Sequence, residues 1–325
     1  MRSYLVVKWA LLLCFCVVGL QAEDEKRHLM RVEKDDAHIT IIRGDQVILR
    51  YNKVPTTDAA KNEPFYSRSG YIHPIYSPSG KVVTGDYSPD HKHQHGLFFA
   101  WTKTEIEGRQ PEFWNQKLEK GRVSFSRAYY KDTIVGSNDK VSFSVEHLWE
   151  DLTAEGGPKP VLKETWTVTA YNAGDDRFVF DIEAVQWLQG PNPLTVEKYH
   201  YGGMAIRGTT QWMPESKEAE PVGTMVTSEG LERIEGNHSR PDWVAMHGPV
   251  DDGHAGFAVI SDARNFRAPQ WVRLHPSMPY FVFSPMVEEP FQIVSGKPYV
   301  SRFRYVIFDG EPDEKIIERE SAKER

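Results

Sequence analysis

Short runs of β-branched and aromatic residues recur along almost the whole chain, and turn residues separate them. No window before residue 311 shows a sustained apolar period of 3.6 residues, so the pattern does not favour long amphipathic helices. Turn segments such as Gly156-Gly157-Pro158 stand between the runs. We therefore predict an all-β chain. The predicted strands cover residues 38–43, 46–51, 96–101, 122–130, 140–149, 161–171, 177–187, 256–260, 271–274, 280–283 and 299–308.

Apolar and polar residues alternate within the longest of these runs. Val141, Phe143 and Val145 face one way and the intervening serines the other, which indicates antiparallel sheet with one buried face. No repeat of about 20 to 50 residues and no long Pro, Gly or Ser linker interrupts the series. We expect one domain over residues 23–310, built as a large sandwich or barrel, and a charged C-terminal tail or helix over residues 311–325.

The first 22 residues have the pattern of a secretory signal peptide. Arg2 and Lys8 precede the apolar run of residues 9–20, and the small residue Ala22 stands at the expected cleavage point. The run has 12 residues, against about 20 needed to cross a bilayer, which favours a cleaved signal over a membrane anchor. Both cysteines of the chain lie in this segment, so the mature protein would have no disulfide or cysteine nucleophile. We expect a secreted or periplasmic protein.

The charge of the chain argues against two classes of partner. The formal net charge is -7, and loss of Arg2 and Lys8 with the signal peptide would make it more negative. Nucleic acids and anionic membranes are therefore poor candidates. The chain also has no P-loop, no GxGxxG after a strand, no HExxH and no GxSxG, so nucleotide binding and zincin or serine-hydrolase chemistry have no support. The oligomeric state stays open.

The densest group of candidate functional residues is the segment Asp90-His91-Lys92-His93-Gln94-His95-Gly96. If it enters the predicted strand that continues over residues 97–101, His91, His93 and His95 point to one face, because side chains alternate with period 2. Near-neutral imidazoles act as general acids and bases. We expect His93 or His95 to transfer a proton in this way, with Asp90 orienting the imidazole.

A divalent metal ion is the alternative for the same histidines. A His-x-His pair on a strand can converge on one ion, and His91, His93 and His95 are the possible ligands. His91 and His95 lie about 13 Å apart along an extended strand, so a remote ligand would complete the set. The candidates for it are His200, His247, His275, Asp86 and Glu105.

Three further segments, over residues 101–115, 197–207 and 265–276, combine aromatic and polar residues, as a sugar-binding site requires. Indole faces stack on pyranose rings, and polar side chains bond the hydroxyls. The glycines of the second segment, Gly202 and Gly203, allow close backbone approach. The alternative for Trp101 and Trp114 is burial in the core. The alternative for Arg273 and His275 in the third segment is exposure to solvent without a ligand. The candidate ligand-binding residues are Trp101, Lys103, Arg109, Trp114 and Asn115 in the first segment, Lys198, His200 and Arg207 in the second, and Arg273 in the third.

Four motifs resemble those of a known family. They are Ser77-Pro-Ser-Gly80-Lys-Val-Val-Thr84, Asp90-His91-x-His93-Gln94-His95-Gly96-Leu-Phe-Phe-Ala-Trp101-Thr-Lys103-Thr, Gly108-Arg109-x-Pro-x-Phe113-Trp114-Asn115 and Tyr305-Val-Ile-Phe-Asp309-Gly310. Together they resemble the secreted bacterial family labelled "methane oxygenase PmoA", over about residues 36–311. The mature chain lacks an apolar stretch of about 20 residues, so we exclude the activity of a true methane oxygenase subunit.

The resemblance implies a periplasmic β-sandwich protein of bacteria that degrade polysaccharides. We expect a large antiparallel sandwich, a supersandwich like that of galactose mutarotase, with a jelly roll as the alternative and a short C-terminal helix. The segment of residues 269–275 departs from the family's Pro-x-x-Trp-His pattern, because Val272 follows Trp271. The resemblance carries over as site positions Asp90, His91, His93, His95, Arg109, Trp114, Lys198 and Arg207.

These observations favour a carbohydrate-active enzyme, a hydrolase, lyase or isomerase that acts on a sugar or glycoside derivative and that a divalent metal ion would assist. Two alternatives remain at this stage. One is a glycan-binding module without catalysis, and the other is a periplasmic metal-binding protein.

Overall fold

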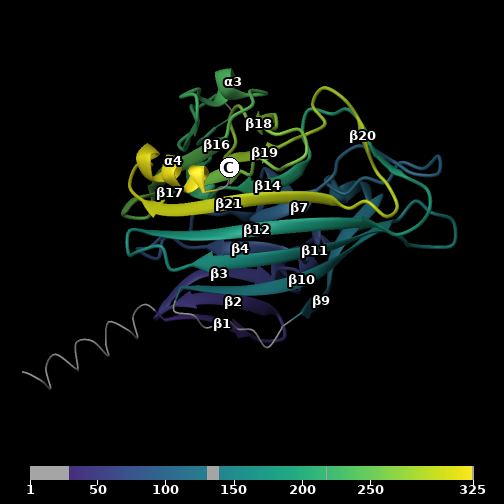
Figure 1. Ribbon diagram of the computed structural model, residues 1–325, viewed down its shortest axis with the longest axis horizontal. Helices are drawn as coiled ribbons and strands as arrows, with labels where there is room; N and C mark the ends of the chain where they lie inside the picture. The colour runs from purple at the N-terminus through teal and green to yellow at the C-terminus, as the bar shows by residue number, and fades with distance from the viewer. Residues whose placement is uncertain (1–28, 130–138, 217, 324–325) are drawn as a thin grey trace, which may run out of the picture.

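Two large antiparallel sheets form the body of the protein in the computed structural model, which describes residues 29–129, 139–216 and 218–323 (Figure 1). The first sheet contains, in spatial order, β1 (Met30–Lys34), β2 (His38–Arg43), β3 (Gln46–Asn52), β4 (Tyr71–Ile75), β7 (Leu97–Ala100), β14 (Gly203–Arg207), β19 (Tyr280–Phe283) and β18 (Val272–Leu274). The second contains β15 (Thr224–Thr227), β16 (Trp243–Val250), β17 (Gly253–Ser261), β21 (Tyr299–Asp309), β12 (Arg177–Leu188), β11 (Lys159–Tyr171), β10 (Lys140–Asp151) and β9 (Gly121–Tyr129).

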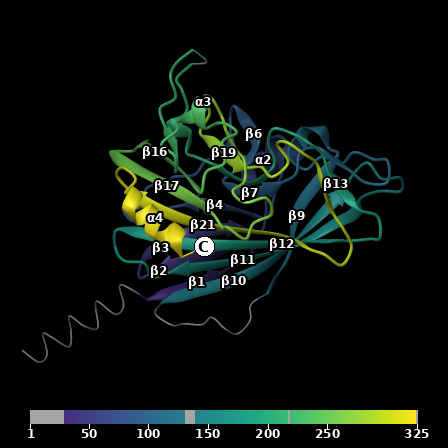
Figure 2. The same cartoon turned by 45° about the horizontal axis from the view of Figure 1, so that its top comes forward.

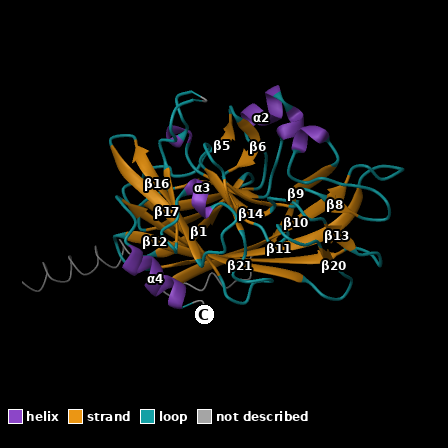
Figure 3. Ribbon diagram, turned by 90° about the horizontal axis from the view of Figure 1, so that it is seen from above, coloured by secondary structure: helices purple, strands orange, loops and turns teal. Residues whose placement is uncertain are grey.

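Smaller sheets and short helices lie at the edges and ends of the two large sheets (Figure 3). A three-stranded sheet joins β20 (Phe291–Ile293), β13 (Leu194–Val196) and β8 (Thr104–Glu105), and a two-stranded sheet joins β5 (Asp86–Ser88) and β6 (His91–His95). The helices are α2 (Thr57–Asn62), α3 (Arg233–Gly236) and α4 (Glu314–Ala322), with the 3-10 turns η1 (Pro64–Tyr66), η2 (Gln116–Leu118) and η3 (Thr210–Trp212). None of the helices within the described residues has the length and apolar character needed to cross a membrane.

Aromatic side chains from both sheets meet in the core between them. The ring of Phe99 on β7 packs edge-on against Trp149 on β10, with 6.0 Å between centroids. Tyr51 on β3 packs edge-on against Phe143, also on β10, at 5.8 Å. All four side chains are buried. Burial of each such side chain contributes about 1.5 to 3 kcal/mol, so these contacts hold the two sheets face to face.

The outer face of the second sheet is partly covered by the C-terminal helix. Asp313 caps α4 by accepting hydrogen bonds from the backbone N–H groups of Lys315 and Ile316. Ile317 on this helix is buried with Trp243 and Phe308 in a second, smaller apolar cluster. The helix therefore lies on β17 and β21 (Figure 1).

The chain breaks direction at Gly96, between β6 and β7. Gly96 has φ of 51°, and a Cβ atom there would lie 2.2 Å from the Ile72 carbonyl oxygen. The expected continuous strand through residues 91–101 is therefore wrong. β7 joins the first large sheet, whereas β6 pairs with β5 and packs against β4 and β14.

The prediction of a large antiparallel β-sandwich with a short C-terminal helix is confirmed. Every predicted strand has a counterpart, within a few residues at each end. The predicted signal peptide, residues 1–22, lies outside the described residues.

Candidate functional site

The histidine segment forms an aromatic cluster with a hairpin that is distant in sequence. The ring of His91 on β6 lies 5.5 Å from that of His93 and 5.5 Å from that of His275, which follows β18. Tyr280, at the start of β19, lies 4.9 Å from His275 and 5.9 Å from His91. Figure 2 shows β6 and β19 on the same side of the molecule. The fold therefore brings together three histidines and a tyrosine from two chain segments.

A buried ion pair anchors this cluster. Arg207, the last residue of β14, donates from both terminal nitrogens to Asp90, at 3.0 and 2.8 Å, and its side chain is fully buried. It also donates to the Gln94 side chain at 3.0 Å. Asp90 lies 2.7 Å from Nδ1 of His91. Burial alone would raise the pKa of Asp90, but the bonds from His91 and Arg207 outweigh it and hold this pKa well below its usual range.

His95 belongs to a second, buried set of hydrogen bonds. Its Nδ1 lies 2.7 Å from Asp86 and its Nε2 lies 3.1 Å from the side-chain oxygen of Gln116. Asp86 also accepts a hydrogen bond from the Tyr71 hydroxyl at 3.0 Å. Because both ring nitrogens of His95 have partners and its side chain is buried, this histidine has no free nitrogen for a substrate or an ion. It holds β6 against η2 instead.

His93 stands between these two sets and is held neutral. No described group forms a hydrogen bond with its ring. Burial lowers its pKa to about 3, and His91, His95 and Arg207 contribute to the decrease because each disfavours a further positive charge. A neutral imidazole with unpaired ring nitrogens can accept a proton from a bound molecule.

His275 is also held neutral, and its hydrogen bonds define where its proton lies. The ring Nδ1 accepts hydrogen bonds from the backbone N–H groups of Ser277, at 3.2 Å, and Met278, at 2.9 Å. The proton of the neutral ring is therefore on Nε2. Burial, with His91 and nearby arginines, lowers the pKa of His275 to about 3.

The side chain of Arg273 adds positive charge without a matching carboxylate. It acts electrostatically on His275, on Tyr280 and on His200. No carboxylate among the described residues pairs with it, and its buried Nε has no hydrogen-bond partner. Asp90 pairs with Arg207, so Arg273 is a cation beside the histidines that no described carboxylate neutralises directly.

Aromatic rings form one side of the cluster. Tyr201 packs edge-on against Trp114 at 5.0 Å and against Tyr199 at 5.0 Å. Trp114 itself is buried behind them, 6.4 Å from Tyr280. The neighbouring His200 is exposed. The accessible rings beside the histidines are thus those of the two tyrosines, while Trp114 supports them from behind. Asn115 joins this side through its contact with Tyr201.

Several predicted ligand-binding residues lie elsewhere. Trp101 as a sugar-stacking residue is wrong, because its ring is buried in the core and its Nε1 donates to Gln186 at 2.9 Å. Arg109 forms ion pairs with Asp151 and Glu107. Lys103 precedes β8 and Lys198 follows β13. Neither these lysines nor Arg109 contacts the histidines among the described residues.

The side chains whose donor atoms could bind one metal ion lie away from the histidine segment. Within the described residues, the three-ligand group whose donor atoms converge is His247, His254 and Glu311. The donor atoms of His91, His93 and His95 form no such group there. His247, a candidate remote ligand for the histidine segment, therefore belongs to another cluster.

Residues 38–322 match the sequence profile of a known protein family. The chain belongs to DUF6807, a family of unknown function. Among solved structures, this DUF6807 chain is similar to a mutant of the heparan sulfate lyase HepC from Pedobacter heparinus, with 10% identity and a TM-score of 0.37, over 88% of this chain and 37% of that one. The unmutated HepC gives 9% identity and a TM-score of 0.34, over 87% and 35%. This chain thus spans little more than a third of the length of either. No curated protein matches.

Sequence reasoning missed some residues of the candidate site in this DUF6807 chain. Tyr280 and Gln116 gave no local signal, because their roles depend on contacts with His91 and His95 across the fold. His275 and Arg273 were found from their shared strand face, which the structure places beside the histidine segment.

Proposed function

We propose that this DUF6807 protein is a carbohydrate-processing enzyme that transfers protons on a sugar derivative. The class of reaction is one that needs a base and an acid, such as hydrolysis, elimination or isomerisation. The observation that carries the proposal is the neutral His93, whose ring has no hydrogen-bond partner among the described residues. His93 is the base. His275 is the hydrogen-bond donor to the substrate oxygen on which negative charge develops, because its Nδ1 accepts backbone hydrogen bonds and its proton stays on Nε2.

The chemistry of the walls favours a sugar derivative that carries negative charge. Tyr199 and Tyr201 offer partly exposed rings for stacking on a pyranose. Arg273 offers a guanidinium that no described carboxylate pairs with, and whose Nε has no hydrogen-bond partner, for a carboxylate or another anionic group. An oxidised sugar, such as a uronic acid, satisfies both features.

An anionic substrate would also activate His93. In the free protein burial lowers the pKa of His93 to about 3, and the positive charge of Arg207 contributes to the decrease. A bound carboxylate nearby would offset part of the electrostatic contribution and raise this pKa toward neutrality. Proton transfer is most efficient when the pKa of the base is near the working pH, so binding of the substrate would itself improve catalysis.

We also propose that the protein acts outside the cytoplasm. The predicted signal peptide and the resemblance to the PmoA-labelled family of polysaccharide-degrading bacteria favour a periplasmic or secreted enzyme. Its substrates would then be fragments of extracellular polysaccharide.

The test compares His93→Ala with a matched surface control, His38→Ala. Both proteins are incubated with a panel of neutral glycosides and oxidised sugars, and products are detected by mass spectrometry. We expect His93→Ala to reduce turnover at least about 100-fold, the usual contribution of a general base, while thermal melting and substrate binding stay close to wild type. His38→Ala should leave turnover unchanged, because His38 pairs with Asp35 at the surface. Turnover at the wild-type rate in His93→Ala would contradict the proposal.

A glycan-binding module is the second candidate, and the two tyrosines favour it. If it is correct, the wild-type protein binds members of the panel without forming product. Tyr201→Ala then weakens binding, whereas His93→Ala does not. Calorimetric titration of the same panel separates the two functions.

A further inference from the structure

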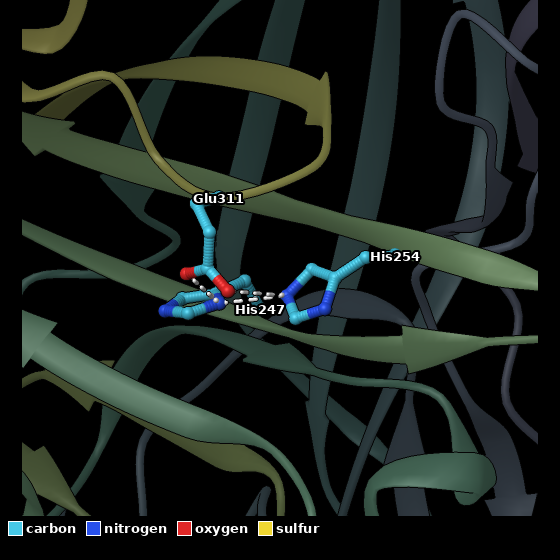
Figure 4. A group of neighbouring side chains, drawn as sticks. All are labelled: His247, His254 and Glu311. Atoms are coloured by element: carbon cyan, nitrogen blue, oxygen red, sulfur yellow. Dashed lines mark hydrogen bonds and ion pairs between the residues drawn. The ribbon is translucent and has the colours of Figure 1, made fainter.

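A second histidine cluster lies on the other large sheet, outside the candidate active site (Figure 4). His247 is on β16 and His254 on the neighbouring β17, and Glu311 follows β21. Nδ1 of His247 lies 2.9 Å from Nε2 of His254 and 3.1 Å from a carboxylate oxygen of Glu311. The other oxygen of Glu311 lies 3.6 Å from Nε2 of His254. Three potential ligand atoms therefore face one another around one point.

These separations match the spacing of ligands around a tetrahedral ion. Zinc lies about 2.0 to 2.2 Å from imidazole nitrogen and carboxylate oxygen. Ligands at such distances on a tetrahedron are about 3.3 Å apart, which falls within the observed range of 2.9 to 3.6 Å. An ion could thus be bound by small side-chain rotations without movement of the strands.

The strands hold the two histidines in register. β16 and β17 form a tight hairpin in which His247 is paired with Gly256, and a Cβ atom at Gly256 would lie 2.5 Å from the Cβ of His247. The backbone N–H of Gly310 donates to the carbonyl of His254 at 2.7 Å, which fixes the start of the segment that carries Glu311. The ligand set is therefore supported by backbone pairing.

The charges in the cluster are those that a cation would balance. Glu311 contacts the two imidazoles, and no lysine or arginine among the described residues forms an ion pair with it. The His254 and Glu311 side chains are 33% and 71% exposed, which leaves a path for an ion and for a water ligand.

We propose that His247, His254 and Glu311 bind a divalent transition-metal ion, with a remaining coordination position open to solvent. Two imidazoles and one carboxylate favour zinc or a similar ion over magnesium or calcium, which prefer oxygen ligands throughout. The site is independent of the histidine segment around His93. It does not rest on the proposed acid and base chemistry.

The experiment measures zinc binding to the full chain, purified without a histidine tag and stripped with a chelator. Zn²⁺ is titrated in competition with a chromogenic chelator, and Co²⁺ is added separately to record visible absorption from the bound ion. The variants are His254→Ala and Glu311→Gln, with His38→Ala as control. His38 is the matched control because it also lies beside a carboxylate and is 31% exposed. Circular dichroism checks the fold of each variant.

We expect one equivalent of Zn²⁺ in the wild type and in His38→Ala, with tetrahedral-type Co²⁺ absorption. His254→Ala should weaken binding at least about 100-fold and Glu311→Gln about 10-fold, since a lost ligand costs at least as much as the 10- to 100-fold of a lost supporting contact. Absence of Zn²⁺ and Co²⁺ binding at millimolar metal would overturn the proposal. So would binding that persists in His254→Ala but disappears in His93→Ala, because the ion would then lie at the histidine segment.

Discussion

At the scale of single residues, Asp90 links the fold to the candidate site. It neutralises the fully buried Arg207 and positions the ring of His91. We expect Asp90→Asn to lower the free energy of unfolding by about 3 kcal/mol, because it leaves a buried guanidinium without its counter-charge. Urea unfolding monitored by fluorescence measures this change.

The control for this substitution is Asp252→Asn, which removes the carboxylate of an exposed pair with Lys81. Its effect should be far smaller, because solvent screens an exposed ion pair. Equal effects of the two substitutions would show that the pair of Asp90 and Arg207 is not buried in solution.

Residue spacing predicted part of the site, and burial decided the rest. The alternation of His91 and His93 was visible in the sequence and places their rings 5.5 Å apart. The sequence could not distinguish Trp101, which packs in the core, from a stacking residue at the surface. The partners that fix His95 come from two other segments, so no local pattern revealed that both of its nitrogens are occupied.

At the scale of elements, one glycine separates β6 from β7. Gly96→Ala should lower the free energy of unfolding by about 2 to 5 kcal/mol, because the new methyl group meets the Ile72 carbonyl and an alanine at positive φ is strained. Gly80→Ala is the matched control, since Gly80 has φ of 84° but no atom within 4 Å of the added Cβ. It should cost only the conformational strain, about 1 kcal/mol. Urea midpoints that fall equally would contradict the steric account.

Strands were predictable where one face is buried and the other is not. β10 to β12 alternate in this way along most of their length, and their bounds were close to those predicted. β14 and β16 were not predicted. β14 is buried at every position and β16 at all but one, so neither shows alternation, and glycine and other weak strand formers interrupt both. The equally buried β7 and β19 were predicted from their aromatic runs. β14 nevertheless carries Arg207, which made the assembly of the site the least predictable part of the fold.

At the scale of the whole molecule, the packing of the β5–β6 sheet on the first large sheet buries two imidazoles near the buried Arg207. His93 and His275 both have their pKa lowered to about 3, mainly by burial. In the unfolded chain a histidine titrates near 6.5. Between these two values the unfolded state binds more protons than the folded state, so stability falls as the pH decreases.

This difference predicts a loss of stability in mild acid that depends on these two side chains. From pH 6.5 to pH 5, His93 should lower the free energy of unfolding by at most about 2 kcal/mol, since each pH unit is worth about 1.4 kcal/mol per proton. Urea midpoints measured from pH 7.5 to pH 5 should therefore decrease steadily in the wild type. The decrease should be smaller in His93→Gln and smaller again in His93→Gln combined with His275→Gln. The same slope in all three proteins would mean that these histidines accept protons in the folded state. That outcome would contradict the neutral His93 on which the proposed mechanism depends.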